Sequence, residues 1–153
     1  MRILPITSIA LGICISFVSA FGQVIEPANQ PKGCEINQAR LDNLGLSFSK
    51  LNDDTLLIII GHLGSGETSA EINRHRLYNA REYILARTPS LRRDRTLTAE
   101  GEKLTGLGKV EFYVGGKVVD SLLVGKNRIL CVDCCQNPLF KPYKGNQRKS
   151  RKK

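Results

Sequence analysis

The chain has 153 residues, enough for one domain with a single hydrophobic core. Its net charge of +9 is unevenly placed: from residue 141 onward there are seven Lys or Arg residues and no acid, whereas basic and acidic side chains nearly balance between residues 23 and 140. The domain itself is therefore close to neutral, and the positive charge of the chain is concentrated at its C-terminal end.

Residues 1–20 have the layout of a secretory signal peptide. Met1-Arg2 gives a positive start, residues 3–17 are mostly apolar, and Val18-Ser19-Ala20 supplies small or aliphatic residues at a cleavage site. The apolar stretch is interrupted by polar residues and is shorter than the ~20 apolar residues of a membrane span. We expect cleavage after Ala20, with Gly22 as the alternative, and an exported protein that is periplasmic or secreted.

A lipoprotein is the other reading of this leader, because Cys14 lies in its apolar region. Ile13 precedes it and is bulkier than the small residue that lipid-modification sites use, which favours the signal peptide.

Residues 21–33 contain Pro and Asn and predict a linker, and residues 34–51 follow as a helix. The apolar residues of this helix recur at helical spacing: Cys34, Leu41, Leu44, Phe48 and Leu51. Residues 55–60 are nearly all aliphatic and predict a buried strand, since they leave no polar face.

A second helix is expected to start near Ser69, because Thr68 and Glu71 form a capping box. Thr88-Pro89 ends it, and its inner face would carry Ala70, Leu77, Ala80 and Ile84.

The remaining segments read as strands. Residues 95–100 alternate in polarity, and residues 109–114 and 117–124 flank Gly115-Gly116, which predicts a two-residue hairpin turn. Residues 128–132 predict a further short strand. The whole order predicts an α+β two-layer sandwich within residues 34–135, with helices on one face of a mixed sheet.

The loop after the first strand resembles a phosphate-binding loop with one residue changed. Residues 61–68 read G-x-x-x-x-G-E-T, where a nucleotide loop has G-x-x-x-x-G-K-[ST]. A nucleotide loop uses its lysine to neutralise phosphate, and Glu67 would repel it. We therefore expect no nucleotide binding.

The same region is similar to the OmpA-like peptidoglycan-binding domain. An apolar strand ends in Gly61-His62, a glycine-bearing loop follows, and a helix carries Arg76 and the run Arg81-Glu82-Tyr83-Ile84. The later segments 100–102 and 108–112 are similar to the family's G-x-G-E and R-R-V-E-F motifs. The resemblance covers about residues 34–124.

This resemblance implies a β-α-β-α-β core and a grip on the diaminopimelate of the peptidoglycan stem peptide. Arg76 matches the family's Arg, whose fork binds a carboxylate, and His62 matches the His of its G-H-T-D motif. The Asp of that motif falls on Gly64, and Glu67 is the candidate substitute. The predicted ligand-binding residues are thus Arg76, His62 and Glu67.

Other polar groups give weaker signals. His62 and His75 near Glu67 and Glu71 resemble a metal set, but ordinary loop and helix histidines are the preferred interpretation, so we predict no metal and no cofactor. Several arginines form either a patch for an anionic ligand or a solvated face: Arg74, Arg76, Arg81, Arg92, Arg93 and Arg95.

Four cysteines remain after the leader: Cys34, Cys131, Cys134 and Cys135. In an exported chain an even number favours disulfides, and Cys34 is expected to pair with one of the C-terminal three. A redox pair of Cys131 and Cys134 and a zinc site are the alternatives.

Residues 136–153 predict a basic disordered tail, which either only solubilises the chain or binds an anionic partner. Catalytic constellations at a credible spacing are missing from the sequence. We expect a non-catalytic cell-envelope module that binds peptidoglycan or another anionic envelope component, with nucleic acid an unlikely partner. The alternative is a thiol-disulfide redox protein that uses Cys131 and Cys134.

Overall fold

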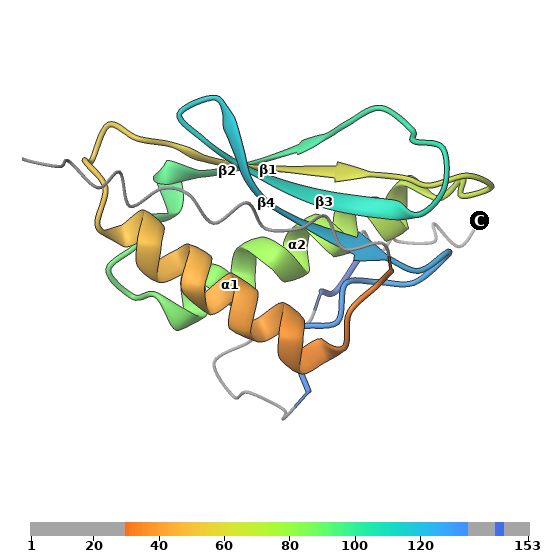
Figure 1. Ribbon diagram of the computed structural model, residues 1–153, viewed down its shortest axis with the longest axis horizontal. Helices are drawn as coiled ribbons and strands as arrows, with labels where there is room; N and C mark the ends of the chain where they lie inside the picture. The colour runs from red at the N-terminus through yellow and green to blue at the C-terminus, as the bar shows by residue number, and fades with distance from the viewer. Residues whose placement is uncertain (1–29, 135–142, 146–153) are drawn as a thin grey trace, which may run out of the picture.

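Two helices pack on one face of a four-stranded sheet (Figure 1). The computed structural model describes residues 30–134 and 143–145. Helix α1 (Cys34–Ser49) and helix α2 (Ala70–Arg87) lie side by side beneath the sheet in Figure 1. This arrangement confirms the predicted α+β sandwich. The predicted signal peptide and most of the predicted linker lie outside the described residues.

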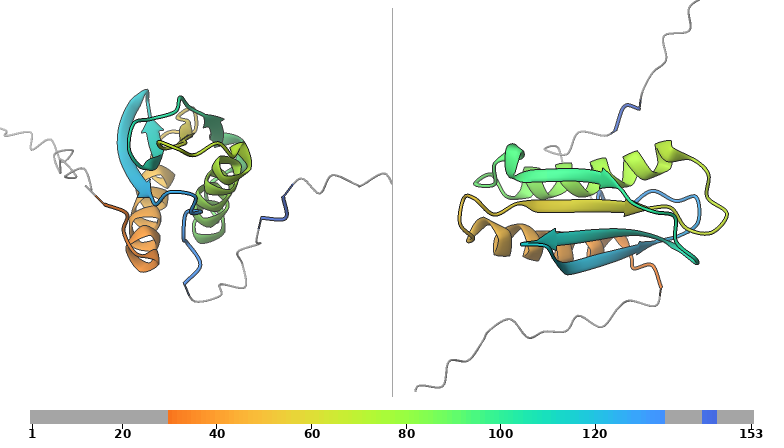
Figure 2. Two further views of the ribbon diagram at one scale, coloured as in Figure 1. Left: turned by 90° about the vertical axis from the view of Figure 1, so that its right-hand side faces the viewer. Right: turned by 90° about the horizontal axis from the view of Figure 1, so that it is seen from above.

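The sheet contains the strands β1 (Leu57–His62), β2 (Thr96–Glu100), β3 (Gly108–Val114) and β4 (Lys117–Val124). Their order across the sheet is β2-β1-β3-β4, as the view from above shows (Figure 2, right). β1 and β2 are parallel because α2 carries the chain back between them, and the other two pairs are antiparallel. β3 follows β2 without an intervening helix, and the described residues hold no strand before α1.

The two predicted helices and the four predicted strands between residues 55 and 124 are confirmed with small shifts at their ends. Leu41, Leu44 and Phe48 face the core from α1. This helix ends at Ser49, so Leu51 lies just beyond it and is partly buried. α2 begins one residue later than the predicted capping box implies, because the side chain of Ser69 accepts the N–H of Ile72.

The hairpin between β3 and β4 turns at Gly115-Gly116, as predicted. Both glycines have positive φ, 58° and 78°, a conformation that side chains with a Cβ rarely adopt.

The two faces of the sheet differ in burial. On the face covered by the helices, Leu57, Ile59, Val110 and Phe112 are fully buried. The alternate residues of the strands point to the opposite, open face, where Leu97 is 45% exposed. Among residues 30–134 and 143–145, no helix covers this open face (Figure 2).

The chain after β4 does not form the predicted fifth strand. Residues 125–132, called the strap below, are irregular and run along both helices. Leu130 and Val132 are each only 1% exposed, so the strap completes the core. Its carbonyl groups accept hydrogen bonds from side chains of the helices instead of from a neighbouring strand: Arg76 to Arg128, Asn79 to Leu130, Asn37 to Cys131 and Gln38 to Val132.

Candidate functional site

The loop between β1 and α2 holds a buried ion pair beneath it. The guanidinium of Arg76 binds the carboxylate of Glu67 through two nitrogens, with Nη2 2.6 Å from Oε1 and Nη1 2.9 Å from Oε2. Both side chains are fully buried. Glu67 lies in the loop, and Arg76 follows nine residues later on α2, which places its guanidinium under that loop.

Every donor of the Arg76 guanidinium has a partner within the chain. In addition to Glu67, it donates to three backbone carbonyls, those of Arg128 (2.9 Å), Gly125 (3.3 Å) and His62 (3.4 Å). A guanidinium has five N–H groups. The described contacts use all of them, so none is left to bind a ligand.

The Glu67 carboxylate is equally well satisfied. It accepts the backbone N–H of Gly64 at 2.7 Å and that of Asn127 at 2.6 Å, besides the two bonds from Arg76. The hydrogen bonds from Arg76 lower the pKa of Glu67 to about 2, against the opposing effect of burial. The pair therefore ties three segments together: the loop, α2 and the strap.

The predicted ligand site of Arg76, His62 and Glu67 is not open to a ligand at Arg76. The structure brings Arg76 and Glu67 together, but Glu67 occupies the fork that the resemblance assigns to a ligand carboxylate. Gly64, at the position of the family's Asp, has no room for a side chain, since a Cβ there would lie 2.5 Å from both the carbonyl oxygen of Gly106 and the nitrogen of Gly108.

The side chain of His62 lies apart from this pair, on the open face of the sheet. Its Nδ1 is 2.8 Å from the carbonyl oxygen of Glu102, and its Nε2 is 3.2 Å from Oε2 of Glu111. Both partners are acceptors, so both hydrogen bonds form together when each ring nitrogen carries a proton. Only the backbone carbonyl of His62 contacts Arg76.

The loop also lacks the features of a phosphate cradle. Three of its backbone N–H groups are used inside the protein: Gly64 donates to Glu67, Ser65 donates to the carbonyl of Gly106, and Glu67 donates to the carbonyl of Gly64. A phosphate site needs such groups free and pointing outward. This use of the N–H groups supports the expectation that the loop binds no nucleotide.

The arginines of the possible anionic patch have partners of their own. Arg76 and Arg95 are buried, and the five arginines other than Arg76 bind as follows: Arg74 to Glu71 and Glu100, Arg81 to the carbonyls of Thr96 and Arg93, Arg92 to Asp94, Arg93 to Glu82, and Arg95 to Asp53. Carboxylates therefore offset most of this charge, which favours the alternative of a solvated face.

Three cysteines meet where the first helix begins and the strap ends. The sulfur of Cys131 lies 2.6 Å from that of Cys34, and the two are unbonded thiols. Burial raises the pKa of the Cys34 thiol, and hydrogen bonds with Cys131 and Cys134 raise it further. The structure thus brings together three of the four predicted disulfide residues, and Cys135 lies outside the described residues.

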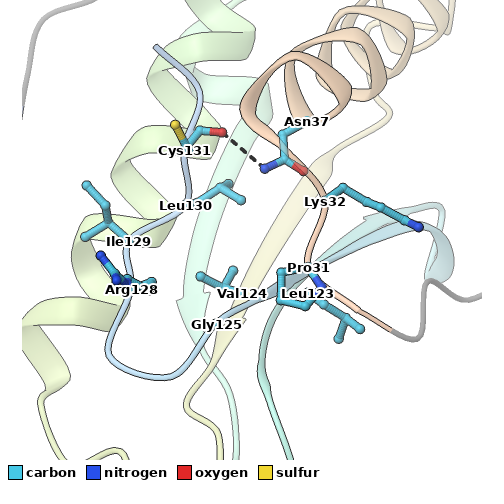
Figure 3. A pocket seen from close by; sticks show the side chains of 10 residues that line it. All are labelled: Pro31, Lys32, Asn37, Leu123, Val124, Gly125, Arg128, Ile129, Leu130 and Cys131. Atoms are coloured by element: carbon cyan, nitrogen blue, oxygen red, sulfur yellow. Dashed lines mark hydrogen bonds between the residues drawn. The ribbon is translucent and has the colours of Figure 1, made fainter. Parts of the chain in front are cut away.

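A shallow cavity of about 260 Å³ lies beside these cysteines, between the strap, the end of β4 and the start of α1 (Figure 3). Aliphatic residues dominate its lining, and the Lys32 side chain extends away from Arg128. Asn37 Oδ1 is buried there without a partner among the described residues. The Oδ1 atoms of Asn73 and Asn79, which do not line the cavity, also lack one. This orphan oxygen therefore does not mark the cavity as a ligand site.

Part of the predicted disordered tail has a defined place. The hydroxyl of Tyr143 donates to Glu71 at 2.8 Å, and its ring lies 4.7 Å from that of His75 and 5.1 Å from that of Tyr78. Burial lowers the pKa of His75. Tyr143 thus packs against the surface of α2.

Within residues 30–134 and 143–145, no group of three or more potential ligands could hold a metal ion. Neither helix of this part of the chain has the length and apolar character of a membrane span. No protein family, characterised protein or solved structure matches the chain.

Proposed function

We propose that the protein is an exported, non-catalytic module of the cell envelope, related to OmpA-like domains, which attaches to peptidoglycan or another anionic envelope component. The observation that carries this proposal is that Glu67 fills the fork of Arg76. Attachment therefore falls to the basic C-terminal segment from Lys141 onward rather than to the ancestral peptide site.

The energetics favour this assignment. Removing one partner of a buried ion pair costs about 3–5 kcal/mol, because the other charge is left uncompensated. A charge-assisted hydrogen bond to a ligand returns only about 1.5–3 kcal/mol. A stem-peptide carboxylate in the fork would pair with Arg76 again, but it would have to expel Glu67 and break the bonds of Glu67 with the N–H groups of Gly64 and Asn127, so binding there is disfavoured.

The basic segment is better placed for this role. Tyr143 is held on α2 by Glu71, His75 and Tyr78, and Lys144 beside it is exposed. Lysines and arginines near an anionic polymer gain affinity by releasing its counterions. This attraction is screened beyond ~10 Å at 0.1 M salt, so attachment depends on ionic strength.

Binding to purified cell-wall sacculi tests the proposal. The full chain is compared with a variant in which the seven Lys and Arg residues from position 141 onward are replaced by Gln while Tyr143 is kept. We expect the parent to bind and to be released as salt rises, and the variant to stay in solution. Salt-resistant binding by the variant would contradict the proposal and would indicate that the site at Arg76 binds the cell wall.

A second candidate function is thiol-disulfide exchange by Cys131 and Cys134. Both thiols are exposed, which favours reaction with an external partner. Thiol titration separates the two candidates, since a readily reduced Cys131–Cys134 disulfide supports exchange and its absence supports the envelope module.

A further inference from the structure

The three described cysteines are arranged around Cys34. Cys131 is 97 residues away in sequence, yet its sulfur lies 2.6 Å from the sulfur of Cys34. Cys134, three residues further along the chain, lies close enough to raise the pKa of the Cys34 thiol. Cys34 is half-buried at the start of α1, whereas Cys131 and Cys134 are exposed. One half-buried cysteine therefore lies beside two exposed ones.

The surrounding hydrogen bonds fix this arrangement. Asn37 Nδ2 donates to the carbonyl of Cys131 at 3.2 Å, as Figure 3 shows, and Gln38 Nε2 donates to the carbonyl of Val132 at 3.0 Å. Both donors lie on the first turn and a half of α1, close to Cys34. Helix α1 therefore carries Cys34 and also holds the backbone of Cys131 and Val132 next to it.

We propose that Cys34 is the shared partner in two alternative disulfides, Cys34–Cys131 and Cys34–Cys134, formed by exchange with an external disulfide. The external reactant is a disulfide-bearing protein or small molecule of an oxidising compartment. This inference does not depend on the attachment function. It also differs from a Cys131–Cys134 redox pair, because Cys34 belongs to both disulfides.

The chemistry balances as two successive exchanges. The Cys131 thiolate attacks the external disulfide RSSR, which forms the mixed disulfide Cys131–SR and releases RS⁻. The Cys34 thiol gives its proton to the released RS⁻ and attacks Cys131 Sγ, which closes Cys34–Cys131 and releases the second RS⁻. The external disulfide is thereby reduced to two thiols.

The second pairing arises without any further oxidant. The Cys134 thiolate attacks Cys34 Sγ, forms Cys34–Cys134 and expels the Cys131 thiolate. Burial raises the pKa of Cys34, which makes its sulfur the poorer leaving group, whereas water solvates the exposed Cys131 sulfur. Cleavage therefore retains Cys34 in the bond and alternates its partner.

The two pairings differ in how they hold the strap. A bond to Cys131 fixes the backbone between Leu130 and Val132, the two buried residues of the strap. A bond to Cys134 moves the covalent tie three residues further along and leaves these two residues to their noncovalent contacts. The strap also supplies the Asn127 N–H that donates to Glu67. The disulfide that holds the strap therefore also affects a hydrogen bond of the buried ion pair.

Peptide mapping of the unreduced full chain tests this inference, in a background with Cys14 and Cys135 replaced by Ser. The protein is reduced, oxidised with glutathione disulfide, alkylated with N-ethylmaleimide and digested. We expect both the Cys34–Cys131 and the Cys34–Cys134 links, with the third thiol alkylated in each case. Adding Cys131→Ser should leave only Cys34–Cys134, and adding Cys134→Ser should leave only Cys34–Cys131.

Two results would overturn the inference. One is a Cys131–Cys134 disulfide with Cys34 alkylated, which would instead support the redox pair. The other is an alkylated Cys34 in the Cys131→Ser protein, which would show that Cys134 does not reach it. Circular dichroism of each variant before oxidation confirms that the comparison is made on folded protein.

Discussion

Glu67 and Arg76 form a fork-to-fork ion pair that is completely closed from solvent, with both carboxylate oxygens and every guanidinium N–H engaged. The position that the sequence resemblance assigns to a ligand carboxylate is filled by a carboxylate of the chain itself. A position that looks like part of a binding site in the sequence thus serves to join the loop, α2 and the strap.

Replacing Arg76 by Ala should lower the free energy of unfolding by about 3–5 kcal/mol, because it leaves the Glu67 carboxylate buried and unpaired. Urea denaturation followed by circular dichroism measures this loss. The matched control is Arg74→Ala on the same helix, whose contacts with Glu71 and Glu100 are exposed and should cost at most about 1 kcal/mol. Equal effects of the two variants would contradict the structural role of the pair.

The stability of the protein should fall in acid through Glu67. Its pKa is lowered from 4.5 to about 2 in the folded protein, so its stabilising contribution is fully present above the unfolded value and is lost as the pH falls toward 2. The melting temperature, measured from pH 6 down to pH 2, should decrease below about pH 4.5. Glu67→Gln should be less stable at pH 6 and should lose less of its stability over this range.

Gly64→Asp recreates the acid of the family motif, and we expect it to destabilise the fold rather than to strengthen binding. Its Cβ would meet the backbone of residues 106–108 within about 2.6 Å, and backbone cannot move aside as a flexible side chain can. Gly33→Ala is the control, because nothing lies within 4 Å of a Cβ there. A Gly64→Asp protein with the parent's melting temperature would show that the loop adapts.

The lysine that completes a nucleotide-loop sequence should not create a nucleotide site. Glu67→Lys would place a second cation against buried Arg76, and the loop N–H groups already bond within the protein. We therefore expect an unstable variant and no binding of ATP with magnesium by the parent in calorimetry. Micromolar binding by the parent would refute this interpretation of the loop.

The strap should contribute to stability as a part of the core. Leu130→Ala removes a side chain that is 1% exposed and should cost about 2–5 kcal/mol. Its neighbour Ile129 is 45% exposed, so Ile129→Ala is a matched control with a much smaller effect. Denaturant titration of the two variants gives the comparison, and similar losses would mean that the strap is not held as the structure describes.

Local patterns were sufficient to predict most of the fold. The spacing of Leu41, Leu44 and Phe48 specifies the buried stripe of a helix, and the paired glycines at 115 and 116 specify the hairpin. These signals depend on residues that are neighbours in sequence. The prediction was accurate for this reason wherever a helix or strand is determined by its own periodicity.

The strap could not be predicted in the same way. Its aliphatic residues suit a short strand, but its carbonyl groups are bound by Asn37, Gln38 and Asn79, of which Asn37 lies 94 residues from its partner. Nothing in the sequence links these positions. The Glu67–Arg76 pair was missed for a related reason, since a loop acid and a helix arginine give the same pattern whether they bind each other or a ligand.

The strap also determines when the protein can finish folding. Helix α1 is made first during synthesis, but Leu130 and Val132, which complete the core beside it, come from the other end of the domain. Contacts between such distant residues form late, because the intervening loop must close before they are gained. A chain that is still emerging from the ribosome therefore holds an unfinished core until the strap has been made, and the contacts of Leu130 and Val132 close that core last.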